Sequence, residues 1–299
     1  MPAQQPKPSK KLRQLNALLD QAEREFKIEH PEINTFLDQQ SVPFLSWKHR
    51  SLPESAGAAS PSPAALDAQI AQDVRQASPS ETRKLAENIS AEERAAVLDK
   101  LRATLLLTPG QIEASSLLYL EQQLTELLGF TVSGSLENHS LTFHTGIIES
   151  LPHLRRFPTD SLPMHQRYVE AGLAHHRGIY GWFMSDSSLS AQDELRERYF
   201  VSLPISTIPE WQTQTQVTSQ WFKYRKVIVI NPFDARAVVA CVADNKATSH
   251  LQYQFGGSPE LIREGLFWSP TALGKVCVMF VDDQLDLIPL GPINLQGGA

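Results

Sequence analysis

The amino-acid sequence predicts an α+β protein in which N-terminal α-helices precede a C-terminal β-barrel. Three observations lead to this fold class. Leucine stripes at helical spacing occupy residues 64–128, the apolar period changes after Gly129, and short β-branched runs bounded by turn residues follow. We therefore expect a helical region over 64–129 and a barrel domain over 130–299.

The stretch from Trp221 to Asp244 predicts a β-hairpin. Two apolar runs, 227–230 and 237–242, flank a turn that Asn231 and Pro232 begin. Neither run alternates with polar residues, so we expect both strands to be covered on two faces, as in a small closed barrel or sandwich. The second strand leads into a polar loop, and such loops often carry functional residues.

Composition narrows the class of protein. The chain has 299 residues, enough for about two domains, and 41% hydrophobic residues, enough for at least one sizeable core. A net charge of −6 argues against sequence-independent nucleic-acid binding, which needs a basic face. The N-terminal segment is cationic but lacks an apolar core, and no run reaches the roughly 18 apolar residues of a membrane span. We expect no signal peptide and no membrane span, and these features leave the compartment open.

The N-terminal part divides at a linker. Apolar residues at helical spacing predict an amphipathic helix over 12–29 within an N-terminal helical segment, 1–50. The small, polar and proline-rich stretch 51–63 predicts a flexible linker. Helical patterning resumes at 64–77, at the start of the helical region 64–129.

Two further helices have recognisable ends. Ser90 and Glu93 form a capping box before a leucine stripe that Thr108 and Pro109 end. The next helix is expected from about Gln111 to Leu128, with a glycine at the position of a C-terminal cap.

The β-region should contain several more elements. Irregular, proline-bracketed sequence at 151–160 predicts an ordered loop, and the acidic, serine-rich stretch 185–197 predicts another loop. Ser258 should cap a short helix. Further strands are expected at 178–183, 198–203 and 274–283. Cys241 and Cys277 lie in apolar runs, which favours two buried, reduced thiols over a disulfide or a redox pair.

Several of these pieces, in this order, resemble the double-psi β-barrel of the rare lipoprotein A family. The matching segments are 180–183 as an opening strand, 227–244 as hairpin and strand-end aspartate, 258–261 as the short helix, and 275–281 as the closing strand. The resemblance covers about 178–292. It implies a six-stranded barrel, a place in cell-wall biology and, in some members, lytic cleavage of peptidoglycan glycan strands.

The acidic residues of that family match only in part. Asp244 occupies the strand-end position, but Asn245 and Lys246 follow it where the family has a basic or aromatic residue and then Gly-Pro. The family's second aspartate falls on Gly256. A lytic transglycosylase can work with one carboxyl group, which protonates the glycosidic oxygen and then accepts the proton of the sugar's own hydroxyl.

The candidate catalytic residues are therefore Asp244 as general acid and His250 as the group that orients it or the sugar. The alternative is a structural role, in which the Asp244 side chain hydrogen-bonds to nearby backbone in a turn. Aspartates have this structural role more often than a catalytic one. Candidate substrate contacts are Asn245, Lys246, Tyr180 and Trp182. Aromatic side chains can also stack on sugar rings if they share a groove: Trp182, Tyr199, Trp211, Trp221 and Trp268.

Histidines are concentrated between residues 144 and 176. A metal site is the sharper interpretation, but no H-E-x-x-H or comparable ligand spacing is present, and the run from His175 to Arg177 is typical of a solvated loop. We assign no metal and no cofactor from the sequence, and the question stays open. The residues concerned are His144, His153, Asp160, His165, His175 and His176.

Two classes of function remain. The first is a cell-wall-associated barrel that binds peptidoglycan and can cleave it as a lytic transglycosylase. The second is a non-catalytic interaction or structural protein, in which the N-terminal helices recruit a protein partner and the barrel is a scaffold. The absence of a second acidic residue favours the non-catalytic function, whereas the presence of Asp244 favours the enzymatic one.

Overall fold

The computed structural model of the chain describes residues 89–184, 188–246 and 252–296. All described residues belong to one compact unit, which lies within Pro61–Ala299. The helices expected at 12–29 and 64–77, the linker at 51–63 and the candidate residue His250 lie outside the described residues.

Six of the described strands close into a β-barrel, which confirms the predicted α+β class with a barrel. Around the barrel the order is β4, β8, β5, β7, β6, β9 and back to β4. The barrel strands are β4 (Thr145–Ser150), β5 (Phe200–Leu203), β6 (Lys226–Asn231), β7 (Arg236–Asn245), β8 (Phe255–Gly257) and β9 (Lys275–Val281). Short strands extend or flank it: β1 (Val132–Ser133) on β9, β10 (Gly291–Asn294) on β7, and the pair β2 (Ser135–Leu136) and β3 (His139–Ser140).

The strand pairing repeats itself between the two halves of the barrel. If β4, β5 and β6 are exchanged with β7, β8 and β9, every pair maps onto another pair of the same sense. The parallel pair β4·β8 becomes β7·β5, also parallel, and the antiparallel pair β4·β9 becomes β7·β6, also antiparallel. The antiparallel pairs β5·β8 and β6·β9 map onto themselves. The barrel is therefore two interleaved three-strand units with pseudo-two-fold pairing.

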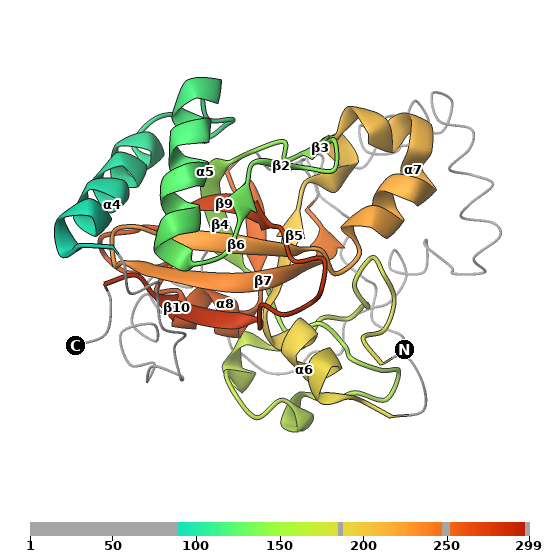
Figure 1. Cartoon of the computed structure of the whole chain (residues 1–299). Coiled ribbons are helices and arrows are strands. Elements are labelled where there is room, and N and C mark those ends of the chain that lie inside the picture. Colours follow the sequence, from blue (N-terminus) through green and yellow to red (C-terminus); the bar gives the residue numbers. More distant parts are fainter. Residues whose placement is uncertain (1–88, 185–187, 247–251, 297–299) are drawn as a thin grey trace, which may run out of the picture. The chain divides into compact units, whose positions relative to one another are not determined.

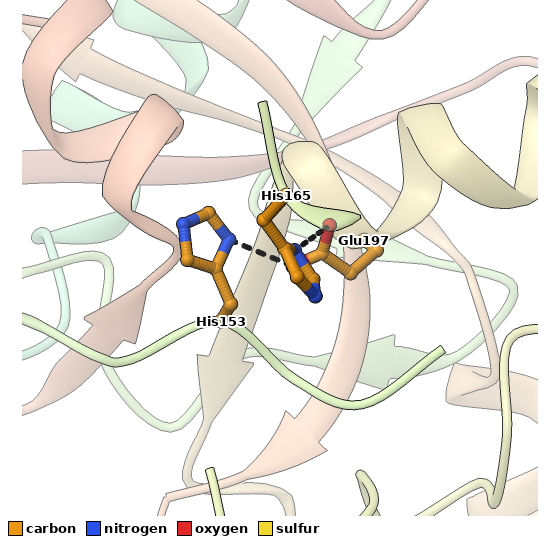
Figure 2. Close-up of side chains that lie close together, drawn as sticks. All are labelled: His153, His165 and Glu197. Carbon is orange, nitrogen blue, oxygen red and sulfur yellow. Dashed lines mark hydrogen bonds and ion pairs between the residues drawn. The ribbon is translucent and has the colours of Figure 1, made fainter. Parts of the chain in front are cut away.

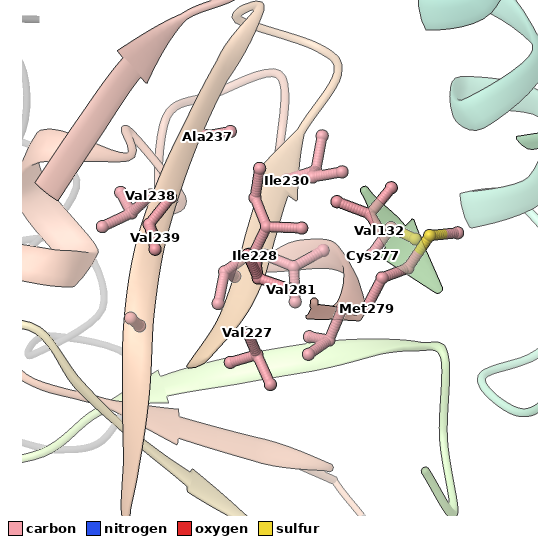
Figure 3. Close-up of a cluster of buried hydrophobic side chains, with 14 of the residues drawn as sticks. Val132, Val227, Ile228, Ile230, Ala237, Val238, Val239, Cys277, Met279 and Val281 are labelled. Carbon is pink, nitrogen blue, oxygen red and sulfur yellow. The ribbon is translucent and has the colours of Figure 1, made fainter. Parts of the chain in front are cut away.

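The predicted hairpin is β6 and β7, and both strands are covered on two faces as expected. Val227–Ile230 and Ala237–Val242 are fully buried. Side chains alternate between the faces of a strand, so a strand that is apolar throughout needs cover on both sides. Figure 3 shows labelled apolar side chains of β6, β7 and β9 gathered in one buried cluster with Val132 of β1, which is paired with Val281 of β9. Cys241 and Cys277 are free and buried, which confirms the assignment of two buried thiols.

Two helices pack beside the barrel. α4 (Ala91–Leu105) begins at the predicted capping box, and α5 (Ala114–Leu128) ends at Gly129 with φ 71°. α5 starts three residues later than expected, because the carboxylate of Glu113 accepts from Ser115 N and Ser116 N and caps the helix there. The two helices lie side by side, α4 against β9 and β4 and α5 against β1 (Figure 1).

Two predictions for the middle of the chain are wrong. The segment 178–183 forms no strand; it is an irregular turn with one bridge between Gly178 and Gly181, where Gly181 has φ 93°. Residues 191–197 are not a loop, because α6 (Ala191–Arg198) begins there at a capping box of Ser190 and Asp193. α6 has no apolar stripe, since its sequence AQDELRER is almost entirely polar, and so its period gives no signal.

The remaining helices frame the barrel. α8 (Pro259–Glu264) follows the predicted Ser258 cap, and all six of its residues are buried. α7 (Pro209–Phe222) precedes β6 and was not predicted from the sequence. Three 3₁₀ turns complete the described structure: η2 (Leu162–Met164), η3 (Val169–Ala171) and η4 (Ile205–Thr207). None of the helices in the described ranges combines the length and apolar character needed to cross a membrane.

Candidate functional site

Asp244, the predicted acid, lies at the end of β7 and is half-buried. Its Oδ1 accepts a hydrogen bond of 3.2 Å from the backbone N–H of Ile179. Burial raises the pKa of the Asp244 carboxyl above its ordinary value, although backbone N–H donors and nearby cations oppose the rise. A carboxyl group with a raised pKa can donate a proton. Through its bond to Ile179 N, Asp244 also connects the turn that precedes Trp182 to the end of the barrel.

The predicted substrate contacts do not gather around Asp244 as a set. The side-chain oxygen of Asn245 accepts from Ser206 N at 3.1 Å, and the ammonium of Lys246 pairs with Glu149 on β4. Tyr180 lies near Asp244, and its hydroxyl is buried without a hydrogen-bond partner in the described structure. Asn245 and Lys246 therefore hold the strand end in place.

Trp182 belongs to a groove beside the barrel. A pocket of about 750 Å³ is lined by Trp182, Phe183, Met184, Arg196, Gln220, Trp221, Lys223, Tyr224, Arg225, Lys226, Val281, Asp283 and Asp286. Trp182 and Trp221 are the two members of the predicted aromatic set that line it. Tyr199 is instead buried in the core, and Asp244 does not line this pocket.

Cations stand over the aromatic rings of this groove. The Arg196 guanidinium lies 4.6 Å from the centroid of the Tyr224 ring, and that of Arg225 lies 4.3 Å from the Trp221 ring. Lys226 is neutralised by Asp283 and Asp286. Lys223 forms no ion pair with a described residue and lies 5.5 Å from the Tyr224 ring. The groove thus combines flat apolar faces with cationic groups that are available to an anionic ligand.

Gly256, onto which the predicted resemblance to the rare lipoprotein A family places the second acid, is packed closely against Leu151. It is buried on β8, and a Cβ atom built there would lie 2.6 Å from Cδ1 and 3.0 Å from Cγ of Leu151. Distances this short force a neighbouring side chain to move. A carboxylate at residue 256 would therefore require the Leu151 side chain to move.

The histidine-rich region contains a second, buried constellation. Among the described residues, His153, His165 and Glu197 form the group of metal-ligand type whose donor atoms all lie within 4.8 Å of one another. Figure 2 shows both imidazoles turned toward the Glu197 carboxylate. Nδ1 of His153 lies 3.1 Å from Oε1 of Glu197, and Nδ1 of His165 lies 3.4 Å from Oε2.

Two more carboxylates belong to this group. Asp160 lies 3.0 Å from Nε2 of His165 through Oδ2, and Glu260 on α8 lies 3.8 Å from Nδ1 of His153 through Oε2. Burial raises the pKa of Glu260 to about 7. Burial lowers the pKa of His153, but the hydrogen bond to Glu197 and the charge of Glu260 raise it more, and the net shift is upward.

The structure selects only part of the predicted histidine cluster. His153, His165 and Asp160 come together, whereas His175 and His176 are exposed on a loop, as the bland interpretation expected. His144 is buried elsewhere, where Nδ1 accepts from Ile112 N. Sequence reasoning missed Glu197 and Glu260; the capping box of Ser190 and Asp193 could have placed Glu197 on a helix, but the burial of both carboxylates is decided by the tertiary structure.

The chain matches no protein-family model, no curated protein and no solved structure. Its resemblance to the rare lipoprotein A family therefore stays a prediction from the residues quoted above.

Proposed function

We propose that the chain is a double-psi-type β-barrel protein that binds glycan strands, with peptidoglycan as the polymer. The observation that carries the proposal is the groove that brings Trp182, Trp221 and Tyr224 together in one pocket of about 750 Å³. Pockets that bind sugars offer flat aromatic faces with polar groups at their edges, and a pocket of this volume is within the usual range for ligand sites.

The barrel topology supports the fold half of the proposal. Two interleaved three-strand units with two parallel pairs, β4·β8 and β5·β7, are the pairing expected of a double-psi barrel. The first of its strands is β4 at Thr145–Ser150, upstream of the segment 180–183 that the resemblance suggested. Topology alone does not identify a substrate, so the proposed class of ligand is inferred from the residues that line the groove.

The charges of the groove favour a glycan that bears carboxylates. Lys223 has no acidic partner among the described residues, and Arg225 pairs with Glu137 only at 3.6 Å. Peptidoglycan presents carboxylates on its peptide stems beside the sugar rings. Because Arg225 and His139 already lie against the Trp221 ring, a strand in the groove would place a sugar ring on Trp182 and its carboxylates against Lys223 and Arg225.

Lytic cleavage is a second candidate function, and the burial of Asp244 favours it. A carboxyl group with a raised pKa holds its proton into the pH range in which it can protonate a glycosidic oxygen. The closure of residue 256 by Leu151 leaves no second acid there to activate water. Between the two cleavage chemistries, the lytic reaction therefore fits better than hydrolysis.

The experiment is a pulldown with insoluble peptidoglycan, combined with analysis of any released muropeptides. We expect Trp182→Ala to lose most of the binding, because it removes one of the aromatic faces of the groove. Tyr119→Ala is the matched control, since Tyr119 is an exposed aromatic on α5 and does not line the groove. Equal retention of the wild-type chain and of Trp182→Ala would contradict the assignment of the groove.

Asp244→Asn separates binding from cleavage. The substitution keeps the side-chain shape and an acceptor for Ile179 N, and removes the transferable proton. If the chain cleaves glycan, the variant should bind as the wild type does and release no muropeptides. Continued release by the folded variant would exclude Asp244 as the acid and leave glycan binding as the function.

A further inference from the structure

The segment between β4 and α6 lacks the usual means of holding a chain in place. Within its described residues, 151–184 and 188–190, regular structure is limited to η2, η3 and isolated bridges. The apolar cluster beneath it is small, with Leu154, Ala174, Phe183, Phe200 and Ala243 as its buried members. Long segments of this kind are uncommon in compact domains and need another source of order. The polar group around Glu197 is in the position to supply it.

The protonation of His153 follows from its neighbours. Its Nε2 lies 3.1 Å from the carbonyl oxygen of Arg167 and 3.3 Å from that of Tyr168. Carbonyl oxygens only accept, so Nε2 carries the proton. In a neutral imidazole the lone pair is then on Nδ1, which faces the Glu197 carboxylate at 3.1 Å.

The same arrangement recurs at His165. Its Nε2 faces Oδ2 of Asp160 at 3.0 Å, and Asp160 also accepts from the backbone N–H and the guanidinium of Arg156. Asp160 is therefore an ionised acceptor, and its pKa is held below the ordinary value mainly by the hydrogen bonds from Arg156, which outweigh burial. Nε2 of His165 then carries the proton, and Nδ1 presents its lone pair to Glu197.

A fourth acceptor points to the same place. Oε2 of Glu260 is buried and has no hydrogen-bond partner in the described structure, and the residue is only 3% exposed. It lies 3.8 Å from Nδ1 of His153. Two imidazole lone pairs and two carboxylates thus converge with no donor between them, unless both imidazoles are protonated.

The net negative charge of this buried group can be balanced in more than one way. With neutral imidazoles, the carboxylates of Asp160 and Glu197 against the Arg156 guanidinium leave one negative charge uncompensated, and an ionised Glu260 makes it two. Arg198 acts on Glu260 only through its field. Protons on the imidazoles or on Glu260, or one divalent cation, supply the missing charge. The charged group consists of Arg156, His153, His165, Asp160, Glu197 and Glu260.

We propose that this group is a divalent transition-metal site, with Nδ1 of His153, Nδ1 of His165 and the Glu197 carboxylate as ligands and Glu260 as the fourth. Ligand atoms about 2 Å from a tetrahedral zinc ion lie roughly 3.3 Å apart. Nδ1 of His153 lies 3.1 Å from Glu197 Oε1 and 3.8 Å from Glu260 Oε2, and Nδ1 of His165 lies 3.4 Å from Glu197 Oε2. These distances are near that spacing, and one donor atom from each of His153, His165 and Glu197 lies within 4.8 Å of the others. Mixed nitrogen and carboxylate ligands suit zinc and its neighbours in the first transition row.

The groups behind the ligands match what metal-bound histidines require. A ligating histidine usually donates its other N–H to a carboxylate or a backbone carbonyl, which fixes the ring and its tautomer. His165 has Asp160 in that role, and His153 has the carbonyls of Arg167 and Tyr168. A cavity of about 30 Å³ lined by His165, Glu197 and Glu260 gives space beside the site for a water molecule.

The ion would tie together four separate parts of the chain. His153 follows β4, His165 follows η2, Glu197 is on α6, and Glu260 is on α8. Because an unfolded chain does not hold such a site together, the binding free energy adds to the stability of the fold. The site is thus an anchor for the segment 151–173, independent of the groove and of glycan binding.

The experiment measures metal content and stability of the full chain, prepared without an affinity tag and stripped with a chelator. On dialysis against Zn²⁺ we expect one ion per chain by elemental analysis and a rise in the melting temperature. Co²⁺ in its place should show the visible absorption of a four-coordinate site. A wild-type chain that binds neither ion and keeps the same melting temperature would overturn the proposal and leave protonated imidazoles as the source of charge.

Variants locate the ion. His165→Ala and Glu197→Gln should lose the bound Zn²⁺, and Asp160→Asn should weaken its affinity about 10- to 100-fold. His175→Ala and His176→Ala are matched controls, because both side chains are exposed and outside the group. If a variant of the group does not fold, the wild-type stoichiometry and the cobalt spectrum still decide. Unchanged Zn²⁺ binding by His165→Ala, or its loss in either control, would place the ion elsewhere.

Discussion

Asn231 offers the sharpest test of how the barrel is held together. Its side chain is completely buried at the end of β6. Oδ1 accepts from Phe233 N at 3.0 Å and Asp234 N at 3.2 Å, while Nδ2 donates to the carbonyl oxygens of Gly265 at 3.1 Å and Leu266 at 2.8 Å. The first pair of bonds shapes the turn, and the second pair joins the hairpin to the end of α8.

Asn231→Asp separates these two roles. Aspartate is an equally good turn residue and can keep both bonds to the turn. It cannot donate to the carbonyls of Gly265 and Leu266, and it places a buried negative charge against them and against the Asp234 carboxylate, which lies 3.0 Å from Nδ2. The Gly265 carbonyl loses its donor at a cost of about 1–2 kcal/mol, whereas the Leu266 carbonyl keeps the bond from Ser269 N; with the cost of a buried carboxylate facing Asp234, the expected loss is about 3–5 kcal/mol.

Urea denaturation followed by circular dichroism measures this loss. For a domain of this size the melting temperature should fall by about 6–20 °C. Asn138→Asp is the matched control, because Asn138 is an exposed turn residue with φ 67°, and its change should stay within about 0.5 kcal/mol. A loss below about 1 kcal/mol for Asn231→Asp would refute the reasoning and make Asn231 a turn former only.

Three further predictions concern the packing and the charges of the barrel. Gly256→Asp should lose about 1–3 kcal/mol of stability, because its Cβ would lie 2.6 Å from Leu151 Cδ1. Leu151→Ala in the same chain should recover part of that loss, and strictly additive effects in urea denaturation would contradict the clash. Asp283→Asn should cost about 1–2 kcal/mol at neutral pH, since the carboxylate holds the buried ammonium of Lys226 at 2.6 Å while Asp286 and the Ile288 carbonyl remain as partners. Burial raises the pKa of Asp283, but the bonds from Lys226 and two backbone N–H groups lower it further, below its ordinary 3.8. Its contribution is therefore fully present above pH 3.8 and is lost as the pH falls through the folded-state pKa, so the gap between wild type and variant should close in acid; a gap that does not depend on pH would exclude the ion pair as its cause. Burial raises the pKa of both Cys241 and Cys277 to about 12, so neither thiol should react with iodoacetamide until denaturant is added, and labelling of the native chain within minutes would contradict the two covered strands.

Local sequence was sufficient for the elements whose signals are local. Two apolar runs around Asn231 and Pro232 predicted β6 and β7, and the caps at Ser90, Gly129 and Ser258 predicted the ends of α4, α5 and α8. Capping, turn chemistry and side-chain period act over a few residues, so they can be read along the chain. Composition likewise placed both thiols in the core.

Elements without an apolar period were not predicted in this way, although α6 begins at a capping box of Ser190 and Asp193 that the sequence contains. α6 is too polar to show a stripe, because it turns Asp193 and Glu197 inward toward other polar groups and not toward an apolar core. The tract 178–183 is aromatic and glycine-rich like a strand, but β4, β8 and β5 already complete one side of the barrel without it. Tertiary pairing decided these cases over propensity.

The candidate sites show the same division. The sequence by itself determined that Asp244 ends a buried strand and that histidines and an aspartate crowd residues 153–165. Only the tertiary structure decided that His153 and His165 meet Glu197 and Glu260, from helices 32 to 107 residues further along the chain, and that Leu151 packs against Gly256. The physical reason is that burial, pKa shifts and metal-type geometry arise between segments that are distant in sequence, and these segments come together only when the barrel closes.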